Sequence, residues 1–312
     1  AQDNEETGAS FFFELPLRQE LEEIICEPKA YLNELMMDEN SGLPSVKEVF
    51  DTTPYTILVV DDNPDMTDFL KRTFEGYFKR IIIAGDGVEA LQLVRSHVPD
   101  IIVSDVMMPR MNGYELCKTI KEDIAISHIP VILLTAKDDK QSLISGYKNG
   151  ADGYLSKPFE VEMLMELIRN RLKNREYTKK RYLNAGLIPT PEESTISLTD
   201  ETFLIKLNSI IQENIDNTNL GIQFICQEVG LGRSSLYNKL KALTGMGANE
   251  YISKLRIEKA ITLISGTDMP FSEIAEKTGF TTPSYFSTTF KQYTGETPSQ
   301  YKERKKKGLT DQ

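Results

Sequence analysis

Five residues that could together carry out phosphoryl chemistry follow short apolar segments of this chain. Asp61 and Asp62 end the segment TILVVDD, Asp105 ends IIVSD, Thr135 lies in PVILLTA and Lys157 lies in YLSKP. The segments are rich in β-branched residues and bounded by Gly, Pro, Asp or Asn, which predicts buried parallel strands alternating with helices. Because ligands bind in the crevice at the carboxyl ends of such strands, we expect these side chains to converge on one point.

The three carboxylates of this set would repel one another, and a hard divalent cation would resolve that repulsion. Magnesium (Mg2+) is usually held by one or two carboxylates together with waters and phosphate oxygens, which suits this sparse set. Asp105 could then attack a phosphoryl group and form an aspartyl phosphate, while the cation neutralises the developing charge. Lys157 would pair with the phosphoryl oxygens, and the Thr135 hydroxyl would donate a hydrogen bond to them.

Each of these features also has a simpler interpretation. Asp61 and Asp62 could only end a strand and cap a helix beginning near Pro64, and Lys157–Pro158 alone indicates a turn. The elements nevertheless occur in order, each after a predicted strand. This combination favours a phosphorylation site over independent structural roles.

With these motifs, residues 55–173 resemble a response-regulator receiver domain. The resemblance implies a flavodoxin-like α/β fold with five parallel strands in the order 2-1-3-4-5. It implies Asp105 as the phosphoacceptor and Asp62 and Asp105 as metal ligands. It also implies that the Met107 carbonyl completes the protein ligands and that Asp61 acts through water.

The same resemblance assigns Thr135 and Tyr154 as a switch pair. On phosphorylation the hydroxyl would move toward the phosphate and the ring would turn inward, reshaping the surface between the fourth and fifth helices. Tyr154 could instead be a strand aromatic that only packs on the sheet. The resemblance further implies a cis Lys157–Pro158 peptide bond, an isomer found in only about 5–6% of such bonds.

Length and charge divide the chain. Its 312 residues predict about two domains with linkers. Residues 200–312 carry 14 Lys and Arg against 13 Asp and Glu, whereas the preceding residues carry 22 against 34, for a net charge of −11 overall. The acidic residues 1–199 are a poor partner for nucleic acid, whereas the nearly neutral residues 200–312 are a tolerable partner.

Cysteine usage and hydropathy predict a cytoplasmic location. Cys26, Cys117 and Cys226 are widely spaced, odd in number and without metal-binding spacing, as expected of thiols in a reducing compartment. No apolar run approaches the eighteen or so residues of a membrane span. The acidic, polar start shows no signal peptide.

From Phe203 to Tyr301 the sequence has a helical period throughout. Short predicted helices flank Gly230 and, 49 positions later, Gly279, and a long amphipathic stretch at residues 250–265 joins the two pairs. Helix, glycine-containing turn and helix is the pattern of a helix-turn-helix motif. Two such motifs braced by one helix could place both second helices in successive major grooves of DNA.

This all-helical part resembles an AraC-type DNA-binding domain. In the second motif and beyond, the resemblance rests on Ile274-Ala275, Gly279-Phe280, Tyr285-Phe286, Phe290-Lys291, Gly295, Thr297-Pro298 and Tyr301-Lys302. In the first motif it rests on SSLYNKLKALTG, followed by LRIEKA in the linking helix. Two positions depart from the family: Gly232 replaces a capping Ser, and Thr288 stands where a basic residue is common.

The predicted recognition helices run from about Arg233 to Leu243 and from Pro283 to Tyr293. Thr282 provides a side-chain N-cap, and Pro283 suits the first helical position. Apolar residues spaced four apart are expected in the core: Leu236, Leu240, Phe286 and Phe290.

The predicted DNA-binding residues lie mostly on the remaining faces of these helices. They are Arg233, Ser234, Ser235, Asn238, Lys239, Lys241, Ser284, Tyr285, Ser287, Thr288 and Lys291. Arg, Asn and Lys can reach base edges, whereas Ser, Thr and Lys more often fix phosphates. For each residue, a merely solvated helix face is the alternative.

The beginning of the chain, with GASFFFELPL, resembles the last strands of a histidine-kinase ATP-binding domain. The predicted organisation is a kinase remnant at 1–17, a linker at 18–54 with a helix near 18–37, the receiver at 55–173, a linker at 174–199, the DNA-binding domain at 200–305 and a tail at 306–312. Residues 169–181 could extend the last receiver helix as a signalling helix or form a polar linker. The basic tail KERKKK could contact phosphates or be a solvated end.

Together the resemblances imply the carboxyl-terminal part of a hybrid two-component sensor. Phosphorylation of Asp105 with magnesium would control sequence-specific DNA binding and transcription. This chain would not be an enzyme beyond accepting phosphate and dephosphorylating itself, whereas its membrane-anchored parent would be a histidine kinase. The expected partners are DNA with two major-groove half-sites per domain, a histidine-kinase module, a second copy of the chain and RNA polymerase.

Two other functions are alternatives to this one. A phosphohydrolase with Asp105 as nucleophile would need a second acid two residues later, where the chain has Met107. A phosphate-sink or docking receiver that does not gate DNA binding is the remaining alternative.

Overall fold

The structure, a computed structural model, describes residues 2–3, 9–10, 50–136, 150–184 and 197–310. Residues 1–49 and 50–312 form two units. In the first unit, β1 (Gln2–Asp3) and β2 (Ala9–Ser10) pair antiparallel. The predicted helix near residues 18–37 and most of the predicted first linker lie outside the described residues.

Five apolar segments of the second unit form a parallel sheet. They are β3 (Thr56–Val60), β4 (Arg80–Ala84), β5 (Ile101–Asp105), β6 (Val131–Ala136) and β7 (Gly153–Lys157). The strand order β4-β3-β5-β6-β7 is the predicted 2-1-3-4-5 order. The central strands are buried on both faces, which explains why they are continuous apolar runs in the sequence.

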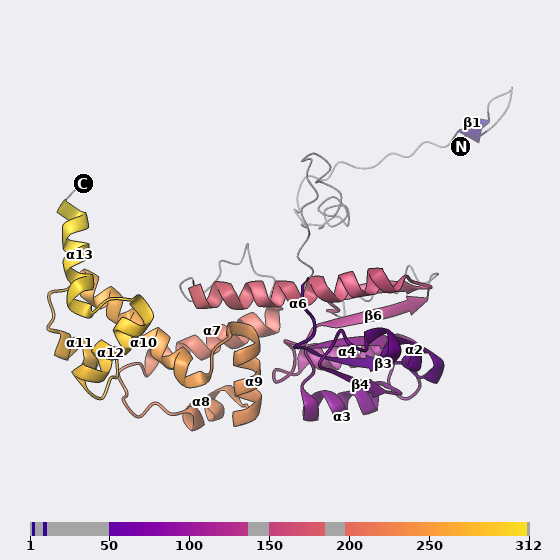
Figure 1. Cartoon of the computed structure of the whole chain (residues 1–312), viewed down its shortest axis with the longest axis horizontal. Helices are drawn as coiled ribbons and strands as arrows, with labels where there is room; N and C mark the ends of the chain where they lie inside the picture. The colour runs from indigo at the N-terminus through magenta and orange to yellow at the C-terminus, as the bar shows by residue number, and fades with distance from the viewer. Residues whose placement is uncertain (1, 4–8, 11–49, 137–149, 185–196, 311–312) are drawn as a thin grey trace. The chain divides into compact units, whose positions relative to one another are not determined.

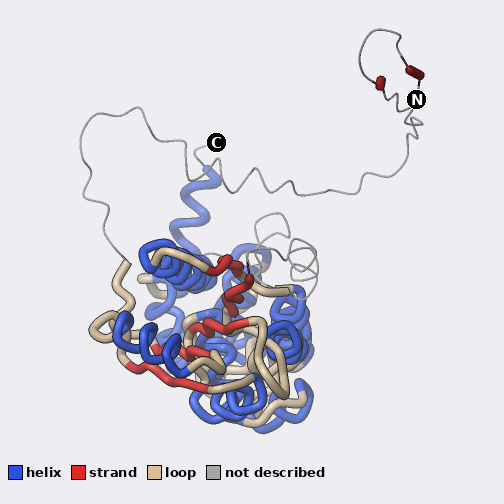
Figure 2. Tube along the Cα trace, turned by 90° about the vertical axis from the view of Figure 1, so that its right-hand side faces the viewer, coloured by secondary structure: helices blue, strands red, loops and turns tan. Residues whose placement is uncertain are grey.

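Helices cover both faces of this sheet (Figure 1; Figure 2). Helices α3 (Gly87–His97) and α4 (Gly113–Glu122) contribute to a core on one face, and α2 (Pro64–Phe74) and α6 (Val161–Asn184) to a core on the other. Alternate residues of each central strand enter opposite cores, since strand side chains alternate in direction. Asn63, not Asp61 or Asp62, caps α2 by accepting from the Asp65 amide.

Helix α6 continues to Asn184, well past the boundary predicted at residue 173. Of the two interpretations of residues 169–181, the helical extension is therefore the one that the structure shows. Arg175 fixes this extension to the sheet, because its guanidinium donates to the Asp100 carbonyl at 3.0 Å and pairs with the Asp100 carboxylate at 3.3 Å.

Beyond residue 197 every described element is helical, as predicted. The elements are α7 (Leu198–Glu213), α8 (Ile222–Val229), α9 (Arg233–Thr244), α10 (Ala248–Gly266), α11 (Phe271–Lys277), α12 (Pro283–Thr294) and α13 (Pro298–Thr310). Helices α8 and α9 form the first helix-turn-helix motif, α11 and α12 form the second, and α10 joins them. None of the described helices is long and apolar enough to cross a membrane.

The two motifs repeat with a spacing of 50 residues from one second helix to the other. Their N-caps are Gly232 and Thr282, and both helices end at a left-handed glycine, Gly245 and Gly295. The Thr282 side chain accepts from the Tyr285 amide and Pro283 begins the helix, as predicted. The four predicted core positions are each at most 1% exposed: Leu236, Leu240, Phe286 and Phe290.

Both turn glycines adopt positive φ, but their surroundings differ. Gly230 has φ 73° and no atom within 4 Å of where a Cβ would lie. Gly279 has φ 71°, and a Cβ there would lie 2.3 Å from the Ile215 carbonyl oxygen. The second turn therefore packs closely on the chain segment between α7 and α8.

Candidate functional site

The register of the parallel sheet brings the predicted phosphorylation residues to one edge. Val60 lies opposite Ser104, so Asp61 and Asp105 follow at the same level of neighbouring strands. In the last two strands Thr135 lies opposite Ser156 and Ala136 opposite Lys157. The strand pairing alone therefore aligns Asp61, Asp105, Thr135 and Lys157 along the carboxyl-terminal edge.

The side chains of this edge are in contact. The Lys157 Nζ lies 2.7 Å from Asp105 Oδ1 and 2.9 Å from Asp61 Oδ2. One carboxylate oxygen from each of Asp61, Asp62 and Asp105 lies within 4.8 Å of the other two. Asp61 and Asp105 are buried, whereas Asp62 is exposed, so the acidic cluster opens to solvent on one side.

Burial and pairing shift the proton affinities of this cluster. Burial raises the pKa of Asp105, and the neighbouring Asp61 charge adds to this, although the Lys157 ammonium opposes it. Burial alone would lower the pKa of Lys157, but its bonds to Asp105 and Asp61 outweigh burial and raise that pKa. A second cation would therefore stabilise the ionised form of the Asp105 carboxylate.

The donor set fits a magnesium ion. The three carboxylates offer only oxygen ligands, and such a small set leaves room for waters and a phosphoryl oxygen, as this ion prefers. Lys157 pairs with Asp61 and Asp105 and neutralises only part of the negative charge of the three carboxylates. The clustering of three carboxylates, only two of which pair with the Lys157 ammonium, is the observation that favours a cation here.

The loop after β5 is held tightly beside Asp105. A Cβ on Gly113 would lie 2.2 Å from the Asp105 carbonyl oxygen, so only glycine allows α4 to begin so close to this residue. Arg110, at φ 64°, pairs with the buried Asp86 carboxylate, and Gly87 N donates to the Met111 carbonyl. These contacts fix the loop that contains Met107, whose side chain is 72% exposed.

The remaining receiver predictions concern Thr135, Tyr154 and Pro158. Thr135 is buried at the end of β6, and Tyr154 is half-buried in β7, where its ring packs against the core beneath α3 and α4. The Lys157–Pro158 peptide bond is cis, as predicted. The predicted switch surface falls partly on residues 137–149, which lie outside the described residues.

A second candidate site lies on the recognition helices α9 and α12. Ten of the eleven predicted DNA-binding side chains are exposed or half-exposed. The prediction that Lys239 lies on a solvent-facing surface is wrong, because this side chain is fully buried. Its ammonium pairs with Asp200 on α7 and lies 5.0 Å from the centre of the Phe203 ring.

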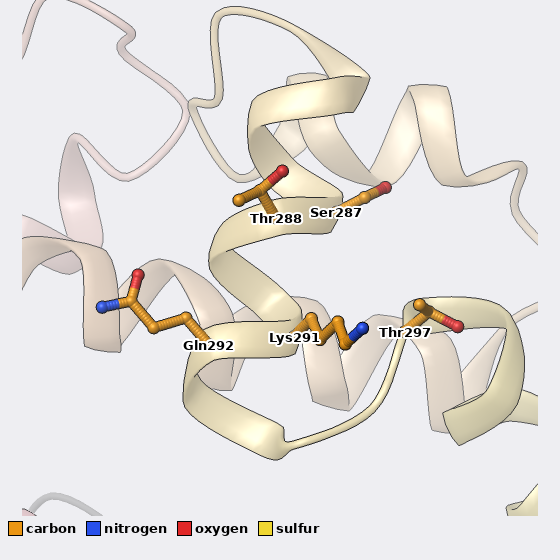
Figure 3. Close-up of a pocket in the computed structure, with 5 residues that line it drawn as sticks. All are labelled: Ser287, Thr288, Lys291, Gln292 and Thr297. Atoms are coloured by element: carbon orange, nitrogen blue, oxygen red, sulfur yellow. The ribbon is translucent and has the colours of Figure 1, made fainter.

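On α12 the predicted residues line a shallow pocket (Figure 3). Ser287, Thr288 and Lys291 are among the residues that line this pocket of about 520 Å³; Figure 3 shows their side chains along α12. Gln292 and Thr297 complete it, and neither was among the predicted residues. Thr297 precedes α13 in sequence, so a contact with α12 could not be inferred from the period of either helix.

The 50-residue repeat identifies Tyr237 as a further candidate that the pattern on α9 alone had missed. Tyr237 occupies the position that Ser287 has in the second motif, just as Leu236 corresponds to Phe286. Its ring is 53% exposed. Aligning the two motifs at their N-caps instead of at their turn glycines would have found it in the sequence.

The basic tail is largely helical and paired. Helix α13 continues to Thr310, past the domain boundary predicted at residue 305. Arg304 pairs with Glu296 at 2.6 Å, and Lys302 pairs with Asp268 at 3.3 Å. These ion pairs compete with phosphate contacts by the two side chains.

Comparisons with known proteins match the two regions that contain these candidate sites. Residues 57–169 match the response regulator receiver domain family, and residues 225–304 match a helix-turn-helix domain family. Histidine kinase P4 of Formosa agariphila is 41% identical over 249 residues, covering 80% of this chain and 18% of that protein. Hybrid signal transduction histidine kinase D of Dictyostelium discoideum is 40% identical over 114 residues, covering 36% of this chain and 7% of that protein.

Among solved structures, the receiver domain of Francisella response regulator 1452 is similar to this chain. It is 36% identical with a TM-score of 0.36, and the match covers 39% of this chain and 98% of that one. This chain spans only a small part of the length of the two kinases.

Proposed function

The chain consists of a response-regulator receiver domain followed by an AraC-type helix-turn-helix domain, and from this premise we propose that it is a phosphorylation-controlled DNA-binding regulator. Asp105 accepts the phosphoryl group; Asp62, Asp105 and the Met107 carbonyl would hold a magnesium ion, and Asp61 would act on it through water. The single observation that carries this proposal is the contact of the Lys157 ammonium with both Asp105 and Asp61 at the strand ends.

Each side chain of the cluster has a distinct role in the phosphoryl transfer. The Asp105 carboxylate attacks phosphorus, and the phosphoryl donor leaves. Lys157 already contacts Asp105, so it is placed to pair with the transferred phosphoryl oxygens. The Thr135 hydroxyl donates to the same oxygens, and Tyr154 follows the movement of Thr135. Magnesium, when bound, neutralises charge on the phosphoryl group.

The output of this regulator is DNA binding through α9 and α12. Arg233, Asn238 and Lys241 reach bases or phosphates from the first recognition helix, together with the exposed serines at its start and Tyr237. The second recognition helix contributes Ser284, Tyr285, Ser287, Thr288 and Lys291. Two helices joined by one linking helix suit two successive major grooves, and a dimer of the chain would bind paired sites.

The phosphoryl donor is the histidine-kinase module of a longer parent protein or of a partner. The similarity to two histidine kinases over part of their length supports this assignment. The two domains matched here are a receiver and a DNA-binding domain, so the chain itself transfers phosphate only to and from Asp105. We propose that residues 1–17 are the end of the kinase domain and that the receiver and DNA-binding domains extend over about 55–173 and 200–305.

A selection of binding sites from random DNA tests this function. The chain is incubated with the pool in magnesium with and without beryllofluoride, a phosphoryl mimic. We expect paired half-sites to be enriched with the mimic and not in Asp105→Asn. Equal enrichment in both conditions would favour the phosphate-sink alternative, and enrichment of no sequence in either condition would refute the DNA-binding assignment.

A further inference from the structure

A buried polar cluster joins the receiver domain to the first helix-turn-helix motif. Asp200 on α7 and Lys239 on α9 form an ion pair that is almost inaccessible to solvent. Ser127 lies in the loop between α4 and β6 of the receiver and is also fully buried. Its hydroxyl donates to the Asp200 carboxylate at 2.7 Å and accepts from Lys239 Nζ at 2.8 Å.

The Ser127 hydroxyl of the receiver helps to stabilise the buried charges of this cluster. Burial would raise the pKa of Asp200, but Lys239 and the hydrogen bonds from Ser127 and Ser197 outweigh it and lower that pKa. Burying an ion pair is unfavourable unless its remaining polar groups are hydrogen-bonded. Ser127 supplies such a bond to each partner, so the charge pair of the DNA-binding domain is completed by the receiver.

Further contacts surround this cluster. The Thr199 hydroxyl donates to the Lys121 carbonyl at 3.2 Å, again across the two domains. Ala125, beside Ser127, packs against the hydrophobic core of the receiver and against that of the first motif. Hydrophobic packing and hydrogen bonds therefore join the same two surfaces.

The two helices that reach this region both begin at the phosphorylation site. Helix α4 starts at Gly113, in contact with the Asp105 carbonyl, and its last turn leads into the loop with Ser127. Helix α6 starts four residues after Lys157 and, with 24 residues, is about 36 Å long. Near its far end the carbonyls of Tyr182 and Leu183 accept from Lys254 on α10.

The second motif has a different environment. Its core consists of residues from the second half of α10 and from α11, α12 and α13, with no receiver residue among the described members. Residues of the first motif, by contrast, share a core with Tyr182 of α6 and contact Ile124 and Ala125 of the receiver.

We propose that the receiver controls the first helix-turn-helix motif directly, through the junction of Ser127 with Asp200 and Lys239, and reaches the second motif only indirectly, through α10 and the segment between α7 and α8. This proposal rests on the proposed function and adds the path by which phosphorylation of the receiver reaches the DNA-binding domain. A change at Asp105 or Lys157 moves the start of α4 or α6, and the loop after α4 and the end of α6 both pack against the core of the first motif. The position of α9 relative to α12 then follows the state of the receiver.

Hydrogen exchange of the full chain tests this route without requiring DNA. The exchange rates of the α9 and α12 amides are compared with and without beryllofluoride and magnesium. Slower exchange in the loop after Asp105 verifies that the mimic has bound. The variant is Ser127→Ala, and the control is Thr52→Val, which removes a buried hydroxyl, just before the receiver, that donates to the Tyr77 carbonyl of the receiver. Thr199→Ala provides a second junction variant in case Ser127→Ala unfolds.

We expect the mimic to change exchange in α9 at least threefold more than in α12. Ser127→Ala should remove most of the α9 response, and Thr52→Val should retain it. An equal response of α9 and α12, no response in either, or a full α9 response in both junction variants would overturn the proposal. DNA titrations of the same samples separate the two claims, because loss of DNA binding with an intact α9 response would refute the proposed function alone.

Discussion

The two helix-turn-helix motifs share a plan of caps, core positions and terminal glycines, but they pack against different partners. The first motif has a largely aliphatic core that is continuous with residues of the receiver, and it encloses the Asp200–Lys239 ion pair. The second has an aromatic core in which Phe280, Phe286 and Phe290 form successive ring contacts at 5.3 and 5.7 Å. A repeated sequence pattern thus gives two recognition helices that pack against different parts of the chain.

This difference follows from single substitutions within the repeat. Lys239 in the first motif corresponds to Thr289 in the second, and both are buried. A buried ammonium needs an acidic partner, which α7 supplies, whereas a threonine does not. The first motif therefore depends on α7 and the receiver, whereas the core of the second is completed by α10 and α13.

The largest expected effect is the loss of the aromatic core of the second motif. Phe286→Ala should reduce the free energy of unfolding of this region by about 3–5 kcal/mol, because it removes a large, fully buried side chain. Hydrogen exchange should rise in α11–α13 and much less in α9. Phe224→Ala, at a 39% exposed position on α8, is the control. Equal loss of protection in both motifs would show that their cores are not independent.

Breaking the ion pair should destabilise the first motif to a similar or slightly smaller extent. Lys239→Met leaves a buried, unpaired Asp200 carboxylate, which we expect to cost roughly 3 kcal/mol in urea denaturation. Adding Asp200→Asn should restore much of this loss because it removes the unpaired charge. If Lys239→Met is as stable as the wild type, the ion pair does not stabilise the first motif.

The two turn glycines provide a smaller, paired test. Gly230→Ala should cost about 1 kcal/mol, since only the left-handed backbone disfavours it. Gly279→Ala should cost at least about 2 kcal/mol, because the added Cβ also collides with the Ile215 carbonyl. Thermal unfolding measures both. Equal costs would mean that the close packing of the second turn does not contribute.

The smallest effect concerns Glu258 on the linking helix α10. Burial raises its pKa to about 7, opposed by the nearby Lys254 ammonium. The folded state then binds more protons than the unfolded state between the unfolded pKa and pH 7, so this residue makes stability fall as pH rises through that window. The melting temperature of Glu258→Gln relative to wild type should increase between pH 5 and pH 8. A constant difference would contradict the shifted pKa.

Much of the fold could be predicted from local patterns. The strand order, the cis Lys157–Pro158 bond and the caps at Gly232 and Thr282 follow from short motifs whose geometry is local or typical of the families. Lys239 could not be placed correctly, because its period on α9 does not reveal that α7 and the receiver cover that face. The lining of the α12 pocket by Thr297 likewise depends on how α13 packs.

The most direct test of the account is the affinity of the full chain for DNA with one half-site scrambled at a time. Binding is measured with and without beryllofluoride and magnesium, in wild type and in Asp105→Asn. The account predicts that the mimic changes affinity at least tenfold on DNA retaining the half-site of the first motif, much less on DNA retaining only the other, and not at all in Asp105→Asn. The same response on both DNAs, or a response that persists without Asp105, would contradict it.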